Sequence, residues 1–463
     1  MLEGESLTMS VIRVGICSLL AFAVLTDGGV PDWSTAVLEI GAALLFVLWG
    51  FVTVRQRQID LRPNWLYLPV LGLIVFCVAQ TFLGLSAYPY ATKIELLKWI
   101  AYFALAFLAV EAFRDGAQLK AFSVFLVSLG FFVALFAIAQ AYTFNGKLYW
   151  FVPLPQSSEP FGPFVDRDHF AGFIEMTAPF GLATLLHRTW RGEKAALVAL
   201  LTAVPIAALI LCGSRGGIVG FAFAVLFLIF ISRRRSIEIR QLFAFASLMT
   251  VCGAIVFWFG ASATMQRFEA LTVSDISRDQ RVSMDRDTLR IFRDHYPTGT
   301  GLGTLETVFP QYETNYTERV VDHAHNDYLE LLAETGIIGG LLGLAFILLL
   351  FRQGFANLNS HECQPRHAFY AGALAACSAL LVHSFVDFNL HVPANACLFL
   401  LLATLASAGK RLHDTWSAEP NVPNWQAGKS EELNRGIIRR IARLRRLGSA
   451  LRRWHLGRNH GCN

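Results

Sequence analysis

The chain consists largely of blocks of about 20 consecutive apolar residues, a length that spans the hydrocarbon core of a bilayer as an α-helix. Hydrophobic residues make up 54% of the sequence and charged residues only 16%, whereas soluble domains carry about 25% charged residues. The mean hydropathy is +0.47. The sequence therefore predicts an all-α, polytopic membrane protein, which excludes an ordinary soluble enzyme.

About twelve apolar runs are candidate transmembrane helices. They are residues 10–25, 36–54, 65–82, 96–113, 121–142, 169–186, 195–212, 217–231, 242–260, 337–351, 369–385 and 392–408. The first run has signal-peptide length, but no small-x-small cleavage site follows it and many spans come after it, so we expect a retained helix. We predict one membrane domain, residues 1–409, and a tail, residues 410–463.

Positive side chains lie in alternate connections between these runs. The even-numbered connections hold Arg55, Arg57, Arg62, Arg114, Lys120, Arg188, Arg191, Lys194, Arg233, Arg234, Arg235, Arg240, Arg352 and Arg366. The odd-numbered connections 28–33 and 387–391 hold no Lys or Arg. Because positive residues mark the cytoplasmic side, we predict that the even-numbered connections and both termini are cytoplasmic.

The segment 261–335, between the ninth and tenth runs, is then a large outer loop. Its residues 279–295 have a helical pattern, with Arg286, Arg290 and Arg293 on one face. These arginines could pair with the acids of the same loop. Residues 298–303 are glycine-rich but lack the preceding strand and the Lys-Ser/Thr of a nucleotide-binding loop, so we exclude that function.

Two histidines, His323 and His325, directly precede a helical pattern. Asp327 and Glu330 have capping-box spacing, which predicts a helix start near Asn326 or Asp327, and Gly336 interrupts the pattern. A helix N-terminus attracts anions and disfavours a cationic imidazole. A neutral imidazole beside an anion site is what a general base for a phosphate-linked substrate needs. The alternative is a pair of histidines on a surface loop.

Three further segments place polar groups on the same predicted outer face. Residues 161–172 carry Arg167 and His169, residues 213–217 carry Arg215, and residues 382–393 contain His383, Asp387 and His391 among apolar neighbours. Ionisable groups at the edge of a membrane are costly and usually line a cavity. We therefore predict a polar site on this face.

The cysteines and the tail suggest other features. Most of the eight cysteines lie inside apolar runs without zinc or redox spacing, so we expect no disulfide framework. Residues 437–454 alternate apolar and arginine positions, which predicts a basic amphipathic helix on anionic lipid at the cytoplasmic side. No nucleic-acid-binding module accompanies it, so we expect no nucleic-acid partner.

The segment His323-Ala324-His325-Asn326-Asp327-Tyr328-Leu329, continued by Glu334-Thr335-Gly336-Ile337-Ile338-Gly339, resembles the His-Asn-x-Tyr-Leu…Glu-x-Gly-x-x-Gly signature of the O-antigen ligase and polysaccharide polymerase superfamily. Ser214-Arg215-Gly216, the segment 281–303 and Asp168-His169 are similar to further family segments, Asp168 being a departure from the usual Asn. The motifs cover residues 161–393 and do not separate ligases from polymerases.

This resemblance implies a GT-C-like glycosyltransferase of the bacterial inner membrane. The donor would be a glycan on undecaprenyl diphosphate at the periplasmic face, and the acceptor lipid A-core, another glycan or a protein hydroxyl. His325 would be the general base, with Arg215 and Arg281 on the diphosphate. We assign diphosphate or glycan contacts also to Arg286, Arg290, His323, Asn326 and His169. The reaction would invert the anomeric centre without a metal or other cofactor.

Three alternatives compete with this function. A metal site could draw ligands from Asp322, His323, His325, Asp327 and Glu330, but the segment lacks the i, i+4 histidine pair of a helical zinc site. A polysaccharide transporter or flippase would also have about twelve spans, but no inverted repeat is evident and the polar residues gather at one membrane face. A non-catalytic scaffold leaves the outer arginines and histidines unexplained.

Overall fold

The computed structural model describes residues 2–56, 61–154, 158–232, 275–315, 320–360 and 364–409, with residues 250, 252 and 254. Apart from those three residues, the predicted ninth span at 242–260 lies outside the described residues, as do loop residues 261–274 and the tail 410–463 with its predicted amphipathic helix. Met1–Gly409 form one compact unit.

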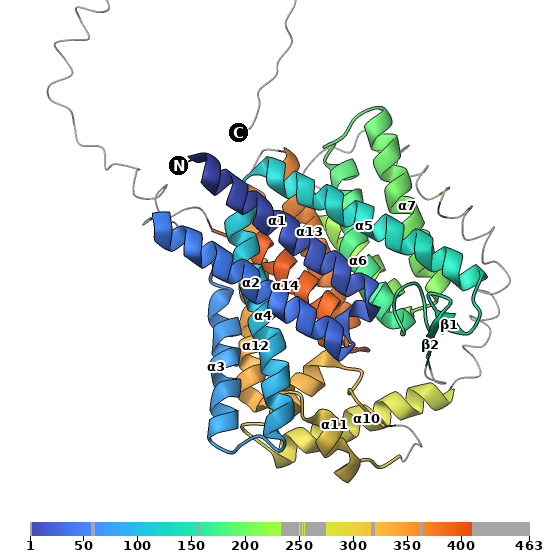
Figure 1. Ribbon diagram of the computed structural model, residues 1–463. Helices are drawn as coiled ribbons and strands as arrows, with labels where there is room; N and C mark the ends of the chain where they lie inside the picture. The colour runs from blue at the N-terminus through green and yellow to red at the C-terminus, as the bar shows by residue number, and fades with distance from the viewer. Residues whose placement is uncertain are drawn as a thin grey trace, which may run out of the picture. The chain divides into compact units, whose positions relative to one another are not determined.

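Helices dominate this unit, which confirms the all-α prediction (Figure 1). The longer helices are α1 (Leu2–Leu25), α2 (Asp32–Gln56), α3 (Tyr67–Phe82), α4 (Pro89–Ala112), α5 (Gly116–Tyr142), α6 (Arg167–Leu186), α7 (Glu193–Cys212), α8 (Arg215–Ser232), α10 (Asp275–Asp294), α12 (Asp327–Ser360), α13 (Gln364–His383) and α14 (Pro393–Ser407). The shorter elements are η1 (Asp27–Gly29), α11 (Leu305–Val308), η3 (Phe309–Gln311), η4 (Asn389–His391) and an antiparallel pair of strands, β1 (Lys147–Leu148) and β2 (Val152–Pro153).

Eleven of the twelve predicted runs lie within the described residues, and each coincides with a helix. Six of these helices are long and apolar enough to cross a membrane, namely α1, α2, α5, α7, α8 and α12, while α3 and α14 are apolar but shorter. The exact number of spans stays a prediction.

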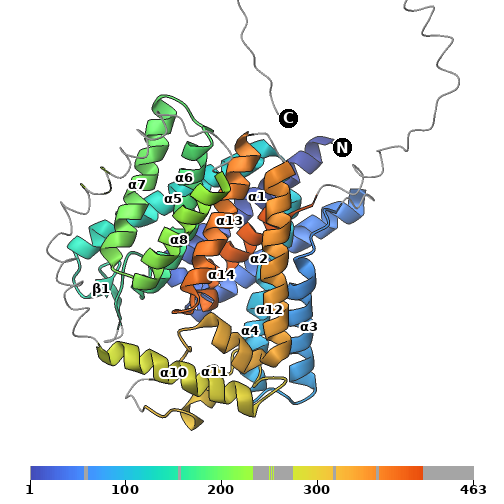
Figure 2. The ribbon, with the colours of Figure 1, turned by 180° about the vertical axis from the view of Figure 1, so that it is seen from behind.

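The core lies where α13 and α14 meet their neighbours. Helix α13 packs against α6 and α8, and α14 packs against α4, α12 and α13 (Figure 2). Every residue of α14 is buried, and so is nearly all of α6. Small residues in α13, which reads Ala-Gly-Ala-Leu-Ala-Ala-Cys-Ser-Ala over 371–379, allow this close approach between helices.

The connections between helices lie at the two ends of the bundle. At one end, the Arg62 guanidinium donates to Arg114 O at 2.8 Å, and Lys120 lies 3.8 Å from the ring centroid of Trp190. These residues belong to three connections, those after the second, fourth and sixth runs, which the charge pattern predicts to be cytoplasmic. At the other end, the Ala87 amide donates to Thr300 O at 2.7 Å. These contacts bring the three connections together at one end, and both the alternation over the whole chain and the end that faces the cytoplasm stay predictions.

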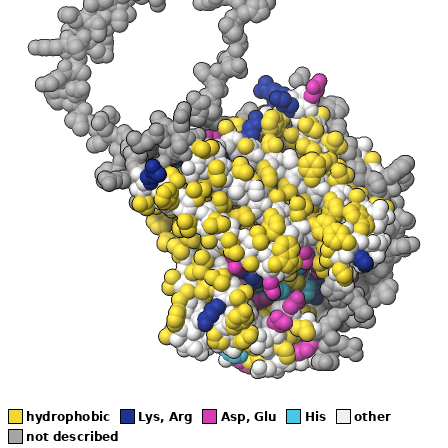
Figure 3. Space-filling view, in the orientation of Figure 1, with side chains coloured by type: hydrophobic (Ala, Val, Ile, Leu, Met, Phe, Trp, Pro, Cys, Tyr) yellow, Lys and Arg dark blue, Asp and Glu magenta, His cyan; other side chains and the backbone are white. Residues whose placement is uncertain are grey.

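Elements α10 and α11 lie across the end of the bundle opposite to the start of α1 (Figures 1 and 2). Figure 3 shows hydrophobic side chains over most of one face, with acidic and histidine side chains gathered above α10 and α11. The helix predicted at 279–295 is confirmed as part of α10.

The turn 298–303 is fixed to a break in α12. Gly336 has φ 63° and ψ −161°, and a Cβ there would lie 1.9 Å from Pro297 O, so only glycine fits. The Glu334 carboxylate accepts from the Gly303 and Leu305 amides at 2.8 and 2.9 Å. Gly301 N–H donates to Glu334 O at 2.8 Å. These amides are thus already hydrogen-bonded within the protein, which agrees with excluding a nucleotide-binding loop.

Candidate active site

His325 lies directly before α12, as the sequence predicts, and has a left-handed backbone conformation with φ 50°. Its side chain is 28% exposed, and its Nδ1 lies 3.2 Å from Asp387 Oδ1. Because Nδ1 faces this carboxylate, Nε2 on the opposite edge of the ring is the nitrogen that can meet a substrate. An imidazole oriented by a carboxylate on one nitrogen is the arrangement of a positioned general base.

Asp387, the partner of His325, has no role in the predictions made from the sequence. It is 1% exposed, its Oδ2 accepts from Asn389 Nδ2 at 3.1 Å, and the same oxygen lies 3.8 Å from His383 Nε2. Burial alone would raise the pKa of Asp387, but the hydrogen bond from His325 and the nearby imidazoles of His169 and His383 lower it below its usual value. Asp387 therefore faces His325 as a carboxylate. The only signal in the sequence was its place between two apolar runs.

A buried ion pair continues this chain of groups into the helix bundle. His383 Nδ1 lies 3.1 Å from Glu175 Oε1, and both side chains are 1% exposed or less. His383 ends α13 and Glu175 lies within α6, so Asp387, His383 and Glu175 join the outer site to the core. Ionisable groups so deep in an apolar bundle are costly unless they are paired, as here.

Arg281 contacts Val386, and the glycine that follows Arg215 packs against the same residue. Arg281 of α10 donates from Nη1 to Val386 O at 3.2 Å, and its Nη2 lies 3.7 Å from Asp168 Oδ2. Arg215 begins α8, and the adjacent Gly216 packs so closely that a Cβ would lie 2.9 Å from Val386 Cγ2. The predicted diphosphate residues Arg215 and Arg281 thus both lie beside the segment that holds Asp387.

Arg286 and Arg290 are exposed and lie farther along α10. Arg290 pairs with Asp287 at 3.0 Å, as the alternative of pairing within the loop predicts. Nine residues of helix separate Arg281 from Arg290, or about 14 Å. Contact of Arg286 and Arg290 with the diphosphate stays a prediction. Their distance from Arg281 favours contact with the glycan, farther from the bond that breaks.

The Phe388 ring contacts three histidines of the predicted site. Its ring centroid lies 4.8 Å from that of His169, 4.6 Å from His323 and 4.8 Å from His325. His169 Nε2 is buried, and among the described residues it has no hydrogen-bond partner. Asn326 caps α12, since its Oδ1 accepts from the Tyr328 and Leu329 amides at 3.2 Å each. A substrate contact by Asn326 stays a prediction, beside this structural role.

The capping box expected from Asp327 and Glu330 does not form. Asp327 Oδ1 faces His391 Nδ1 at 3.0 Å, while Glu330 accepts from the Ala324 amide at 2.8 Å and faces His323 Nδ1 at 2.7 Å. The helix start is confirmed, but the two carboxylates bind imidazoles from other segments, and Asn326 replaces them as the cap. Burial alone would lower the pKa of His323, but Glu330 raises it above its ordinary value.

Three donor atoms in this network could hold a metal ion, namely those of His323, Glu330 and His391, which lie within 4.8 Å of one another. This set shares only His323 and Glu330 with the ligands considered from the sequence. His325 faces Asp387 instead, and Asp327 supports His391. Glu330 Oε1 already faces both imidazoles, in a hydrogen bond with His323 Nδ1 at 2.7 Å and in a contact with His391 Nε2 at 3.3 Å.

We expect His391 to stabilise the fold in a pH-dependent way. Burial lowers its pKa, but Glu330 and Asp327 raise it more, from an ordinary 6.5 to about 10. Its stabilising charge is therefore fully present below pH 6.5 and is lost as the pH rises through about 10. The melting temperature of the wild type should exceed that of His391→Gln at pH 7, and the difference should shrink toward pH 10.5. A difference that stays constant over this range would contradict the assignment.

Comparison with known families gives a match around several of these residues. Residues 195–344 match a family model described as O-antigen ligase. This match supports the O-antigen ligase and polysaccharide polymerase superfamily. This confirms the family predicted from the motifs and, with the apolar helices, indicates a multi-pass membrane protein. No curated protein sequence matches the chain.

The part that matches the O-antigen ligase model contains Arg215, Arg281 and His325. Asp387 and His391 lie beyond its end and are joined to it by the contacts described above. The candidate site is therefore built from the matched segment and from the connection between α13 and α14.

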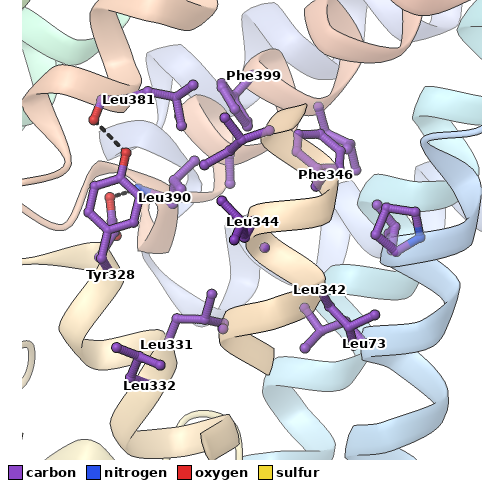
Figure 4. Close-up of a pocket in the computed structure, with 18 of the residues that line it drawn as sticks. Leu73, Tyr328, Leu331, Leu332, Leu342, Leu344, Phe346, Leu381, Leu390 and Phe399 are labelled. Carbon is purple, nitrogen blue, oxygen red and sulfur yellow. Dashed lines mark hydrogen bonds between the residues drawn. The ribbon is translucent and has the colours of Figure 1, made fainter. Parts of the chain in front are cut away.

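An apolar groove of about 690 Å³ adjoins this candidate site, and we name it the α12 groove. Leu331, Leu344 and Phe346 of α12 line it, facing Leu381 of α13 and Phe399 of α14 (Figure 4). Leu73 of α3 lies on its other side. At the end nearest the site, the Tyr328 hydroxyl donates to Leu381 O at 2.6 Å, and the Tyr328 ring lies 4.4 Å from that of Phe385.

Replacing Asp387 by asparagine is expected to lower the rate of glycan transfer by about 100-fold, the lower end of what a positioned acid–base group contributes. The amide keeps the shape but cannot stabilise the imidazolium that forms at His325. The measurement is the rate with a defined lipid-linked donor. Asp322→Asn, an exposed neighbour of His323, is the matched control and should be nearly unchanged. Equal rates for the two variants would contradict the role of Asp387.

Proposed function

We propose that the protein is an O-antigen ligase-like glycosyltransferase. It moves a glycan from undecaprenyl diphosphate to an acceptor hydroxyl at the periplasmic face of the bacterial inner membrane, with both termini cytoplasmic. The observation that carries the proposal is the juxtaposition of a carboxylate-oriented imidazole, His325, with Arg281, which donates to Val386 O, and with the first turn of α8, where Gly216 next to Arg215 packs against Val386. The superfamily of the chain supports the reaction class.

The proton moves to His325. As the acceptor oxygen attacks the anomeric carbon, its hydroxyl proton passes to Nε2 of His325, and Asp387 stabilises the resulting imidazolium through Nδ1. The bond from the anomeric carbon to the diphosphate oxygen breaks, and its electron pair leaves with undecaprenyl diphosphate. Direct displacement from the opposite face inverts the anomeric centre.

The leaving group carries the charge that needs neutralising. Guanidinium groups offer paired hydrogen bonds to phosphate oxygens, and donors already in place where charge develops lower the barrier. Arg281 and Arg215 are the candidates for this role, with His323, His169, Arg286 and Arg290 toward the glycan. No step requires a metal ion or another cofactor, so we expect a chelator to leave the rate unchanged.

Ligase and polymerase share this chemistry and differ in the acceptor, which is lipid A-core for a ligase and a second lipid-linked glycan for a polymerase. A polysaccharide polymerase is therefore the second candidate.

We further propose that residues 261–335 form the periplasmic loop of a membrane domain of residues 1–409. The cytoplasmic tail, residues 410–463, would bind anionic lipid through residues 437–454.

The decisive experiment combines a purified assay with a deletion strain. The protein in proteoliposomes is given a defined undecaprenyl-diphosphate glycan and each acceptor in turn, and products are identified by mass spectrometry. Loss of long chains from lipid A in the strain indicates a ligase, and accumulation of a single repeat unit indicates a polymerase. Movement of the donor across the bilayer without a covalent product would refute transfer and favour a flippase.

A further inference from the structure

We propose that Glu175 and His383 are positioning residues for the base: they hold a positive charge behind Asp387, which keeps His325 neutral and ready to accept a proton. This inference rests on the proposed function and assigns a role to two buried residues that lie behind the site. Three observations support it: the burial of the pair, the two carboxylates that face His383, and the two glycines of α8 that make room for the pair.

The pair is buried inside the helix bundle. His383 Nδ1 lies 3.1 Å from Glu175 Oε1, and the two side chains are 1% and 0% exposed. Among the described residues, Glu175 Oε2 has no hydrogen-bond partner, and His383 is the only cation that pairs with this carboxylate. A buried carboxylate is costly unless a cation offsets its charge, so Glu175 favours the protonated form of His383.

Both ring nitrogens of His383 face carboxylate oxygens. Nδ1 faces Glu175, and Nε2 lies 3.8 Å from Asp387 Oδ2. Only an imidazolium carries a proton on each nitrogen, so this arrangement fits the charged ring. The Asn389 amide lies 3.3 Å from Nδ1, farther than Glu175, and donates to Asp387 at 3.1 Å. The imidazolium therefore lies between two anions, one of which is the partner of His325.

Two glycines of α8, one helical turn apart, leave the space that the pair fills. A Cβ on Gly216 would lie 2.4 Å from His383 Cδ2, and a Cβ on Gly220 would lie 2.5 Å from Glu175 Oε2. The side chains of the pair therefore take the place of side chains on this face of α8. This close packing holds the His383 ring beside Asp387.

A positive charge behind Asp387 provides the balance that a general base needs. The Asp387 carboxylate, 3.2 Å from Nδ1, favours the protonated form of His325, and a base that already holds a proton cannot take one from the acceptor. The charge of His383 on the other carboxylate oxygen offsets this attraction. The offset is partial, because His383 lies farther from Asp387 than His325 does. Asp387 can thus still stabilise the imidazolium of His325 once it forms.

Other titratable and charged groups surround the pair and the base, and the test leaves them unchanged. Asp168 acts on His383, but it also lies 3.7 Å from Arg281, which offsets its charge. The complete set comes from the start of α6, from α8 and from α10, and consists of Asp166, Asp168, His169, Arg215, Arg281 and Asp285.

The test measures the pH–rate profile of glycan transfer in proteoliposomes. The double variant Glu175→Gln/His383→Gln removes both partners, so neither is left as an unpaired buried charge. The acid limb of its profile should move about one pH unit higher, the lower end of the effect of a charge within about 4–6 Å. The rate should therefore fall about tenfold on the acid side and come within a few-fold of the wild type on the plateau at higher pH.

The matched control is Glu111→Gln/Arg114→Gln. It removes another buried ion pair, in which Arg114 Nη2 lies 2.8 Å from Glu111 Oε2, at the opposite end of the bundle. This variant should have a lower melting temperature and an unchanged pH profile. An acid limb that stays in place or moves to lower pH in Glu175→Gln/His383→Gln would overturn the proposal, and so would an equal shift in the control.

A second measurement does not depend on transfer. Nitrogen NMR of histidine-labelled protein in lipid bilayers should show His383, identified by its absence in His383→Gln, as an imidazolium at neutral pH. A neutral His383 in a protein that transfers glycan would overturn the role of the pair and leave the proposed function standing. A charged His383 in a protein that transfers no glycan would support the charged pair and refute the proposed function.

Discussion

Replacing His325 by alanine is expected to slow glycan transfer by about 10³-fold, within the range that a positioned general base contributes. The variant loses the nitrogen that takes the acceptor proton, while the arginines beside Val386 remain. Binding of the donor should change little, so the loss should appear in kcat. The measurement is a single-turnover rate in proteoliposomes with a defined donor and acceptor.

The control for this variant is His295→Ala. His295 directly follows α10, where its Nδ1 is hydrogen-bonded with Ile291 O and its ring contacts Tyr312. Its replacement should leave the rate within a few-fold of the wild type, at equal amounts of inserted protein. If His325→Ala kept a tenth or more of the wild-type rate, His325 would not be the base.

Replacing Arg281 or Arg215 by alanine is expected to lower the rate by about 10²–10³-fold, the effect of removing one donor that stabilises developing charge. Arg281→Lys should recover only part of the loss, because an ammonium group keeps the charge but not the paired hydrogen bonds of guanidinium. The measurement is again the rate with a defined donor, together with the affinity for free undecaprenyl diphosphate.

The effect should decrease with distance along α10. Arg293 is exposed and lies twelve residues beyond Arg281, or about 18 Å. Arg293→Ala is therefore the matched control, with a rate close to that of the wild type and an unchanged affinity for undecaprenyl diphosphate. A uniform loss in Arg281→Ala and Arg293→Ala would show that the arginines only raise the general positive charge of this face.

The sequence predicted much of the fold because the apolar runs and glycine breaks are local signals. The start of α12, its interruption at Gly336 and the helix before the turn 298–303 follow from a few adjacent residues. His325 was also found locally, since it precedes a helix start in a motif of known spacing.

The partners of these residues could not be predicted in the same way. Asp387 is 62 residues from His325, and only the packing of α13 against α6 and α8 brings it there. The capping-box expectation failed for a related reason. Spacing shows that Asp327 and Glu330 could cap a helix, but the competing imidazoles of His323 and His391 come from a loop and from η4. The α12 groove is lined by residues of six helices, α3, α4, α8, α12, α13 and α14, and has no local signal at all.

The bonds of Glu334 and Glu330 determine which changes in chain length the site can absorb. Glu334 fixes the chain at Gly303 and Leu305, and Glu330 fixes it again at Ala324. The segment between these two positions is thus a loop with both ends attached to α12, and lengthening such a loop costs little free energy. Insertions there would leave His325 in place, whereas a single insertion between Ala324 and Glu330 would shift it. Relatives that use larger acceptors could therefore acquire new contacts in the segment between Leu305 and Ala324 while keeping the same base.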